Sequence, residues 1–183
     1  MINVWALPMS ADIGGSKYKI NADFRDVLEI IGILNDHSRP DFLRWQIAIG
    51  LFYEEEIPRR LQKEAMEYLS AFISYGSDEK KPAPKLVDWD QDAQIIVGDV
   101  NKVAGSEIRA MPFLHWWTFL SYFYSVGEGQ LSTIVSIRSK KRKGKKLEKW
   151  EETYYRENRE KIDFKKARTA EDIAAKAYFD KWL

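Results

Sequence analysis

The side chain in this sequence best suited to chemistry is a histidine inside a run of aromatic residues. His115 lies in residues 113–124, FLHWWTFLSYFY, where seven of the twelve residues are Phe, Trp or Tyr. A catalytic or metal-binding histidine needs partner side chains, and the other histidine of the chain, His37, falls in a predicted loop. No H-x-x-x-H spacing and no local carboxylate accompanies His115. We therefore interpret His115 as a packed or surface residue.

Three acids, Asp88, Asp90 and Asp92, have the i, i+2, i+4 spacing of a calcium-binding loop. The glycine and the terminal glutamate of such a loop are missing. The neighbours Trp89 and Ala93 fit the start of a helix, where acidic side chains lie at the positive end of the helix dipole. We predict that these acids cap a helix.

The remaining motifs of common enzymes are also missing. No phosphate-loop pattern follows Gly14-Gly15, and no serine lies in a nucleophile-elbow or S-x-x-K context. The chain has no cysteine, which excludes disulfides, zinc–thiolate sites and cysteine nucleophiles. Because nothing local favours an enzyme, we predict a non-catalytic protein without a metal ion or a cofactor.

A basic run, RSKKRKGKK at residues 138–146, holds seven Lys or Arg residues and no acid. The rest of the chain holds 22 of the 29 basic residues and all 28 acidic residues, so it has a negative net charge. The protein is therefore an acidic body with a basic segment. The segment could bind nucleic acid, dock on an acidic protein surface or serve as a solvated linker, and no nucleic-acid motif accompanies it. Its predicted partner-binding residues are Arg138, Lys140, Lys141, Arg142, Lys143, Lys145 and Lys146.

The aromatic run predicts a helix that is apolar nearly all round. One broad face carries Phe113, Trp116, Trp117 and Leu120, with Phe123 or Tyr124. At least this face is expected in the core, because burial of each large apolar side chain contributes roughly 1.5–3 kcal/mol. The other side carries Phe119 and Tyr122, which pack in the same core or are left for a partner. Both are candidate partner-binding residues.

The elements that position these residues are mostly helical. MSADI and SKYKI flank Gly14-Gly15, a turn signal that predicts a hairpin lying on the helices. Asn21 or Asp23 is the expected N-cap of the first helix. Apolar periodicity predicts helices over about 21–35, 40–53, 58–76, 88–105 and 112–127. Weaker patterns predict a short helix or an extended piece at 130–138, a charged helix at 146–162 and a last helix at 169–183.

The predicted fold is therefore mainly α, with about six to eight helices and a small N-terminal β-hairpin. We predict a helical domain over residues 1–137, with a surface linker near 76–87, followed by a basic segment and helical extension over 138–183. The first residues lack the basic region and long apolar run of a signal peptide, and the apolar runs are too short to span a bilayer. We expect a soluble protein inside a cell.

Four segments carry a family resemblance: GGSKYKINADFRDVLEI, VDWDQDAQIIVGDV, PFLHWWTFLSYFYSV and IVSIRSK. In this order and spacing they resemble the bacteriophage family labelled "gene product fifteen", from about Val4 to Lys161. The sequence departs from the family pattern in NKVAGSEIRAM and after about Lys161. The residues of the resemblance that we interpret as structural are Tyr18, Asp23, Phe24, Arg25, Trp89, Asp92, His115, Trp116 and Trp117.

The resemblance implies a role in phage tail assembly. Members of this family come from long-tailed phages and prophages of Gram-positive hosts, and they are regarded as chaperones that coat the tape-measure protein and help tail-tube subunits polymerise around it. The implied partners are the tape-measure and tail-tube proteins, the implied location is the host cytoplasm, and no membrane is involved. A structural tail or neck component of the virion and a nucleic-acid-binding protein acting through residues 138–146 stay as alternatives, and self-association stays open.

Overall fold

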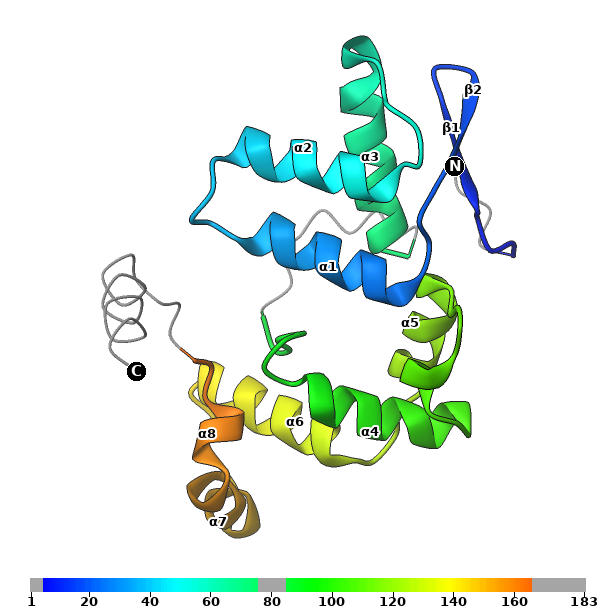
Figure 1. Cartoon of the computed structure of the whole chain (residues 1–183). Helices are drawn as coiled ribbons and strands as arrows, with labels where there is room; N and C mark the ends of the chain where they lie inside the picture. Colours follow the sequence, from blue (N-terminus) through cyan, green and yellow to red (C-terminus); the bar gives the residue numbers. More distant parts are fainter. Residues whose placement is uncertain (1–4, 76–84, 166–183) are drawn as a thin grey trace, which may run out of the picture.

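The computed structural model describes residues 5–75 and 85–165. Within these residues it contains eight α-helices and one antiparallel hairpin of two strands (Figure 1). The predicted mainly α fold with an N-terminal hairpin is confirmed. Figure 1 shows the hairpin and α1–α3 in one half of the molecule and α4–α8 in the other, with α5 lying where the two halves meet.

The hairpin pairs β1 (Ser10–Ile13) with β2 (Ser16–Lys19). Gly14 and Gly15 form the two-residue turn with φ angles of 57° and 77°, and two successive positive values are typical of the turn that suits the twist of a hairpin. The hairpin lies against α3, because the Tyr68 hydroxyl donates to the Ser10 carbonyl at 3.2 Å and the Gly14 N–H donates to Glu64 at 3.0 Å. The predicted position of the hairpin on the helices is thus confirmed.

Three helices form the first half of the chain. α1 (Phe24–Asn35) and α2 (Asp41–Phe52) pack side by side, and α3 (Gln62–Ile73) follows a short 3₁₀ turn and packs on α2. Asp23 caps α1 by accepting the Arg25 N–H at 3.0 Å, which decides between the two predicted caps. Short links and apolar stripes on all three helices explain why sequence periodicity locates them well.

The second half contains α4 (Ala93–Ala104), α5 (Trp116–Tyr124), α6 (Gln130–Arg142), α7 (Lys149–Glu157) and α8 (Arg159–Ile162). α4 packs on α5 and α6, and α8 packs on α6. A second, smaller apolar cluster of Ile134, Ile137 and Ile162 joins α6 to α8. The C-terminal part of the described chain is therefore docked on the helical body.

The main core is built around the two tryptophans at the start of α5. Trp116 and Trp117 are both buried, and their indole N–H groups donate to carbonyls at the end of α3, Ile73 at 3.1 Å and Phe72 at 2.9 Å. A buried indole needs such a partner, because an unsatisfied buried donor is costly. These bonds fix α5 against α3 and place the rest of the aromatic run.

Several element boundaries differ from the sequence predictions for local reasons. α4 begins at Ala93 rather than Asp88, since the Asp88 carboxylate accepts the N–H groups of Asp90 and Gln91 and closes a turn instead. The element predicted at 130–138 is a helix, and it continues to Arg142. The predicted domain boundary at 137/138 consequently falls inside α6. The predicted helix at 169–183 and most of the predicted linker lie outside the described residues.

Candidate partner-binding site

The residues of the sequence resemblance come together where the segment before α1 meets the segment before α5. The Phe24 N–H donates to the Leu114 carbonyl at 2.9 Å, and the Trp116 N–H donates to the Ala22 carbonyl at 2.7 Å. An isolated antiparallel bridge joins Asp23 to His115 at the same place. Backbone hydrogen bonds thus hold together two segments that are far apart in the sequence. These bonds keep the residues up to His115 extended, so α5 begins at Trp116 rather than at the predicted residue 112.

Asp23 is the centre of this junction. Its carboxylate accepts the Leu114 N–H at 2.9 Å and two bonds from the Arg25 guanidinium at 2.7 Å and 2.8 Å. Burial by itself would raise the pKa of Asp23, but the hydrogen bonds from Arg25 and Leu114 outweigh it and lower the pKa below its usual value. The ionised carboxylate therefore stabilises the junction of the two segments.

His115 is buried and has a structural role at the N-terminus of α5. Its Nδ1 accepts the Trp117 N–H at 3.0 Å, and its Nε2 lies 3.1 Å from the Pro8 carbonyl. Nδ1 must be unprotonated to accept, so Nε2 carries the proton and donates it to Pro8. Burial lowers the pKa of His115, and the bond to Pro8 opposes this only in part. His115 is thus a neutral capping residue.

The neutral form of His115 predicts a pH-dependent stability. Below about pH 6.5 the unfolded chain takes up a proton at His115 that the folded chain, with its lowered pKa, does not. The free energy of unfolding is therefore expected to fall as the pH drops from about 6.5 toward the folded pKa. Urea denaturation at several pH values between about 7.5 and 5.5 measures this slope.

Two variants separate this contribution of His115 from other titrating groups. His115→Asn keeps a capping oxygen but does not titrate, so it should lose part of the slope. His37→Gln changes the exposed histidine of the α1–α2 link and should keep the slope of the unmodified chain. Equal slopes in His115→Asn and His37→Gln would contradict the assignment.

Trp89 and Tyr18, two further residues of the resemblance, are partly buried and pack on other aromatic rings. Trp89 packs on the aromatic rings of Trp116 and Phe119, with ring centroids 5.9 Å and 6.1 Å away. The Tyr18 ring meets Tyr53 edge-on at 6.4 Å. These contacts, together with the junction at Asp23, give the resemblance residues a structural role.

Phe119 does not face a partner. It is 1% exposed and stacks on Phe24 with ring centroids 4.9 Å apart. Of the two alternatives left open, the core is therefore the correct one, and Phe119 is removed from the candidate partner-binding residues. Tyr122 is half-buried, whereas Tyr124, predicted as an option for the core face, is 70% exposed. The predicted burial of Trp116, Trp117 and Leu120 is confirmed, and the buried face of α5 also includes Phe119.

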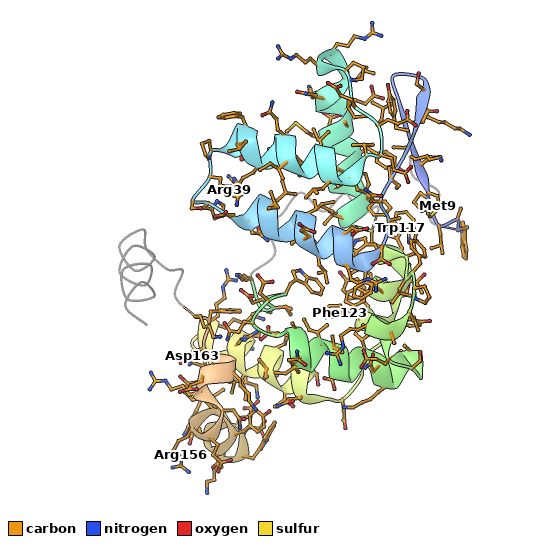
Figure 2. The ribbon with its side chains drawn as sticks, in the orientation of Figure 1. Met9, Arg39, Trp117, Phe123, Arg156 and Asp163 are labelled. Carbon is orange, nitrogen blue, oxygen red and sulfur yellow. The ribbon has the colours of Figure 1, made fainter. Side chains whose placement is uncertain are left out.

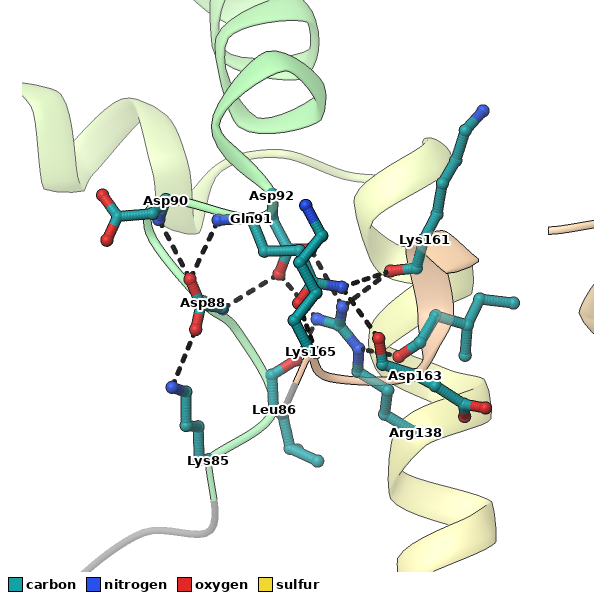
Figure 3. Close-up of polar contacts among 11 residues, drawn as sticks. Lys85, Leu86, Asp88, Asp90, Gln91, Asp92, Arg138, Lys161, Asp163 and Lys165 are labelled. Carbon is teal, nitrogen blue, oxygen red and sulfur yellow. Dashed lines mark hydrogen bonds and ion pairs between the residues drawn. The ribbon is translucent and has the colours of Figure 1, made fainter. Parts of the chain in front are cut away.

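Arg138 is likewise not part of a solvated basic segment. It is buried and forms two bonds to Asp92, at 2.6 Å and 2.9 Å (Figure 3). The remaining N–H groups of its guanidinium donate to three backbone carbonyls, those of Leu86, Lys161 and Ile162. All donors are used inside the protein, which corrects the prediction that Arg138 binds a partner.

The rest of the basic run divides into two groups. Lys140 pairs with Glu151 at 2.7 Å and Lys141 with Asp163 at 2.6 Å, so both hold α7 and the residues after α8 to α6. The other four basic residues are exposed, and within the described residues their side chains form no ion pair: Arg142, Lys143, Lys145 and Lys146. The positive charge left for a partner is smaller than the sequence predicts.

Exposed apolar side chains lie in the segments just before the hairpin and just before α5. These side chains are 49% to 95% exposed and we call them the apolar N-terminal surface: Trp5, Leu7, Met9 and Phe113. The Phe113 ring lies 6.4 Å from the His115 ring, and His115 in turn binds Pro8. Figure 2 places Met9 and Trp117 at the same end of the molecule. Large exposed apolar side chains that lie near one another are candidates for an interaction site.

Sequence reasoning missed this surface and placed Phe113 in the core. The available signal was a group of three large apolar residues, Trp5, Leu7 and Met9, just ahead of the predicted hairpin. Phe113 was misplaced because the junction at Asp23 keeps it outside the helix.

Comparison with family models gives a match to the model described as bacteriophage Gp15 protein over residues 5–164. The chain belongs to the bacteriophage Gp15 family. The match includes α7 and α8, so the segment docked on Arg138 is part of the family region. Comparison with curated proteins and with solved structures found no match.

Two further features of this Gp15-family chain concern the part that the structure describes. No helix in it is long and apolar enough to cross a membrane. Among the same residues no three His, Asp or Glu side chains are grouped so that they could hold a metal ion. The surface features that remain as candidates for function are the apolar N-terminal surface and the exposed end of the basic run.

Proposed function

We propose that this phage protein is a non-catalytic tail assembly factor of the chaperone type. It binds the tape-measure protein, the tail-tube protein or both in the host cytoplasm, and it is released as the tail matures. The observation that carries the proposal is membership of the Gp15 family over residues 5–164, together with the role that the resemblance implies.

The apolar N-terminal surface supports this function physically. A tape-measure protein is a long helical chain with apolar faces that need shielding before the tail assembles. An amphipathic helix that lays its apolar face on an exposed apolar surface is a common mode of recognition. Side chains of Trp5, Leu7, Met9 and Phe113 offer such a surface without any change in the core.

Co-expression with the neighbouring tape-measure and tube proteins, followed by affinity capture of this chain, tests the proposal. We expect the tape-measure protein, the tube protein or both to be retained and kept in the soluble fraction. If neither is retained and neither gains solubility, the proposal loses its basis.

The surface itself can be tested by substitution. Met9→Ser combined with Phe113→Ser should reduce retention of the tape-measure protein by about tenfold or more, because loss of about 1.4 kcal/mol of binding energy already gives a factor of ten. Both side chains are about half exposed, so the melting temperature should change little. Phe42→Ser is the matched control, since Phe42 is exposed on α2 and should not affect retention. Equal retention by the double variant and the control would exclude this surface.

A further inference from the structure

A cavity of about 360 Å³ lies between α6, residues 85–86 and the residues that follow α8. Leu86, Ile162 and Phe164 give it an apolar lining. Arg138 forms part of the wall, with its guanidinium carbon 4.1 Å from the centre of the Phe164 ring. The volume lies in the lower part of the range typical of ligand pockets and is ample for one large side chain.

The rim of this cavity is cationic. Lys85, Lys141 and Arg142 line it, and the first two are already paired with Asp88 at 2.8 Å and Asp163 at 2.6 Å. Arg142 comes four residues after Arg138, so it lies on the same face of α6, directly along the helix from the cavity wall. It has no ion pair with any of the described residues, and it can therefore serve a ligand, unlike the fully bonded Arg138.

Three exposed lysines extend the positive charge beyond the rim. Lys143, Lys145 and Lys146 follow Arg142 in the link between α6 and α7, and none of them pairs with an acid within the described residues. We call the cavity and these four cations the cationic cavity. It combines an apolar hollow with unpaired positive charge at one edge.

We propose that the cationic cavity binds an acidic peptide segment of a partner protein. An aromatic or large aliphatic side chain of the segment occupies the cavity against Leu86, Ile162 and Phe164. Its flanking carboxylates pair with Arg142 and with the lysines of the α6–α7 link, and Arg142 can bind a carboxylate through two parallel N–H groups. Anchoring by one buried side chain inside a charged surround is common at protein interfaces.

Charge decides between a peptide and nucleic acid as the ligand. A nucleic-acid backbone requires a continuous track of cations. Here three of the seven basic residues of the run form ion pairs with acidic residues of the same chain. Arg138 pairs with Asp92, Lys140 with Glu151 and Lys141 with Asp163. Four cations beside an apolar hollow suit a short acidic segment better than a polyphosphate chain.

The position of the cavity makes this a second binding surface. Figure 2 places Asp163, at the cavity, and Met9, in the apolar N-terminal surface, at opposite ends of the molecule. The chain can therefore hold an acidic segment at one end while the apolar surface at the other end is occupied. This inference does not depend on the proposed tail-assembly function.

The test uses the full chain and a fluorescein-labelled peptide of about twelve residues, with one central Phe and four Glu residues around it. Binding is measured by the fluorescence anisotropy of the labelled peptide as the chain is added. We expect saturable binding near physiological salt. Replacement of the peptide Phe by Ser, or of its Glu residues by Gln, should each weaken binding by about tenfold or more, which corresponds to about 1.4 kcal/mol. A DNA duplex of similar length should bind more weakly than the peptide.

Protein variants give the matched comparison. Arg142→Glu should also weaken peptide binding at least about tenfold, whereas Lys63→Glu, the same charge change at an exposed residue of α3, should not. The melting temperatures of both variants should stay near that of the unmodified chain. The inference is overturned if the full chain shows no saturable binding, if DNA binds more tightly than the peptide, if the Ser peptide binds as well as the Phe peptide, or if the two variants behave alike.

The same variants separate this inference from the proposed function. If Arg142→Glu loses the peptide but still retains tape-measure protein on co-expression, both proposals stand and use different surfaces. If the unmodified chain binds the peptide but retains no tail protein, the proposed function fails and the cationic cavity stands.

Discussion

Replacement of Asp92 by Ala is expected to lower the free energy of unfolding by about 3–5 kcal/mol, the usual cost of removing one partner of a buried ion pair. Arg138 would keep its charge in a buried place with three backbone carbonyls and no carboxylate. The variant would also lose the acceptor of the Asp88 N–H, which Asp92 binds at 2.9 Å. Urea denaturation followed by circular dichroism measures the change.

Asp90→Ala is the matched control for this prediction. Asp90 lies two residues away and is exposed, so its substitution should change the free energy of unfolding by no more than about 0.5 kcal/mol. A double variant, Asp92→Leu with Arg138→Leu, should recover part of the loss by removing the unpaired charge. Recovery would be incomplete, because the Leu86, Lys161 and Ile162 carbonyls would lose their donor. An Asp92→Ala variant as stable as Asp90→Ala would contradict the role of the pair.

Phe119→Ala is expected to cost about 3–5 kcal/mol, as for other buried aromatic residues. The ring stacks on Phe24 at 4.9 Å and on Trp116 at 5.5 Å, so its removal leaves a cavity between α1 and α5. Tyr124→Ala, on the same helix but 70% exposed, should change stability by no more than about 0.5 kcal/mol. Thermal and urea denaturation of the two variants distinguish a core residue from a partner-binding one. If the Phe119→Ala and Tyr124→Ala variants were equally stable, Phe119 would not be a core residue.

The elements that follow from local chemistry were predictable. The turn at Gly14-Gly15 predicts the hairpin because two positive φ angles favour glycine. Apolar periodicity predicts α1 to α3 because each helix buries one stripe. The residue types before Phe24 limit the cap of α1 to Asn21 or Asp23, and the structure shows Asp23 in that role.

The features that depend on distant residues were not predictable from the sequence. Periodicity places Phe113 on the core face of a helix, but the bond from Leu114 to Asp23 keeps that segment extended. A run of basic residues looks like one segment, although Asp92, Glu151 and Asp163 lie elsewhere in the sequence and pair with three of its members. One-dimensional charge patterns cannot show which cations are neutralised by the fold.

These corrections change which surfaces are available to a partner. The fold uses the residues of the family resemblance, Phe119 and Arg138 for its own stability. It leaves the apolar N-terminal surface at one end and the cationic cavity at the other. A protein with two separate surfaces can hold one partner while it meets another.

The most direct test of the proposed chaperone function is the ratio of this chain to tape-measure protein, measured by quantitative mass spectrometry in assembly intermediates and in purified phage particles. A chaperone that is released as the tail matures predicts a substantial ratio in the intermediates and essentially none of this chain in the particles. A fixed ratio that persists in purified particles would contradict release and would make the protein a structural component of the virion.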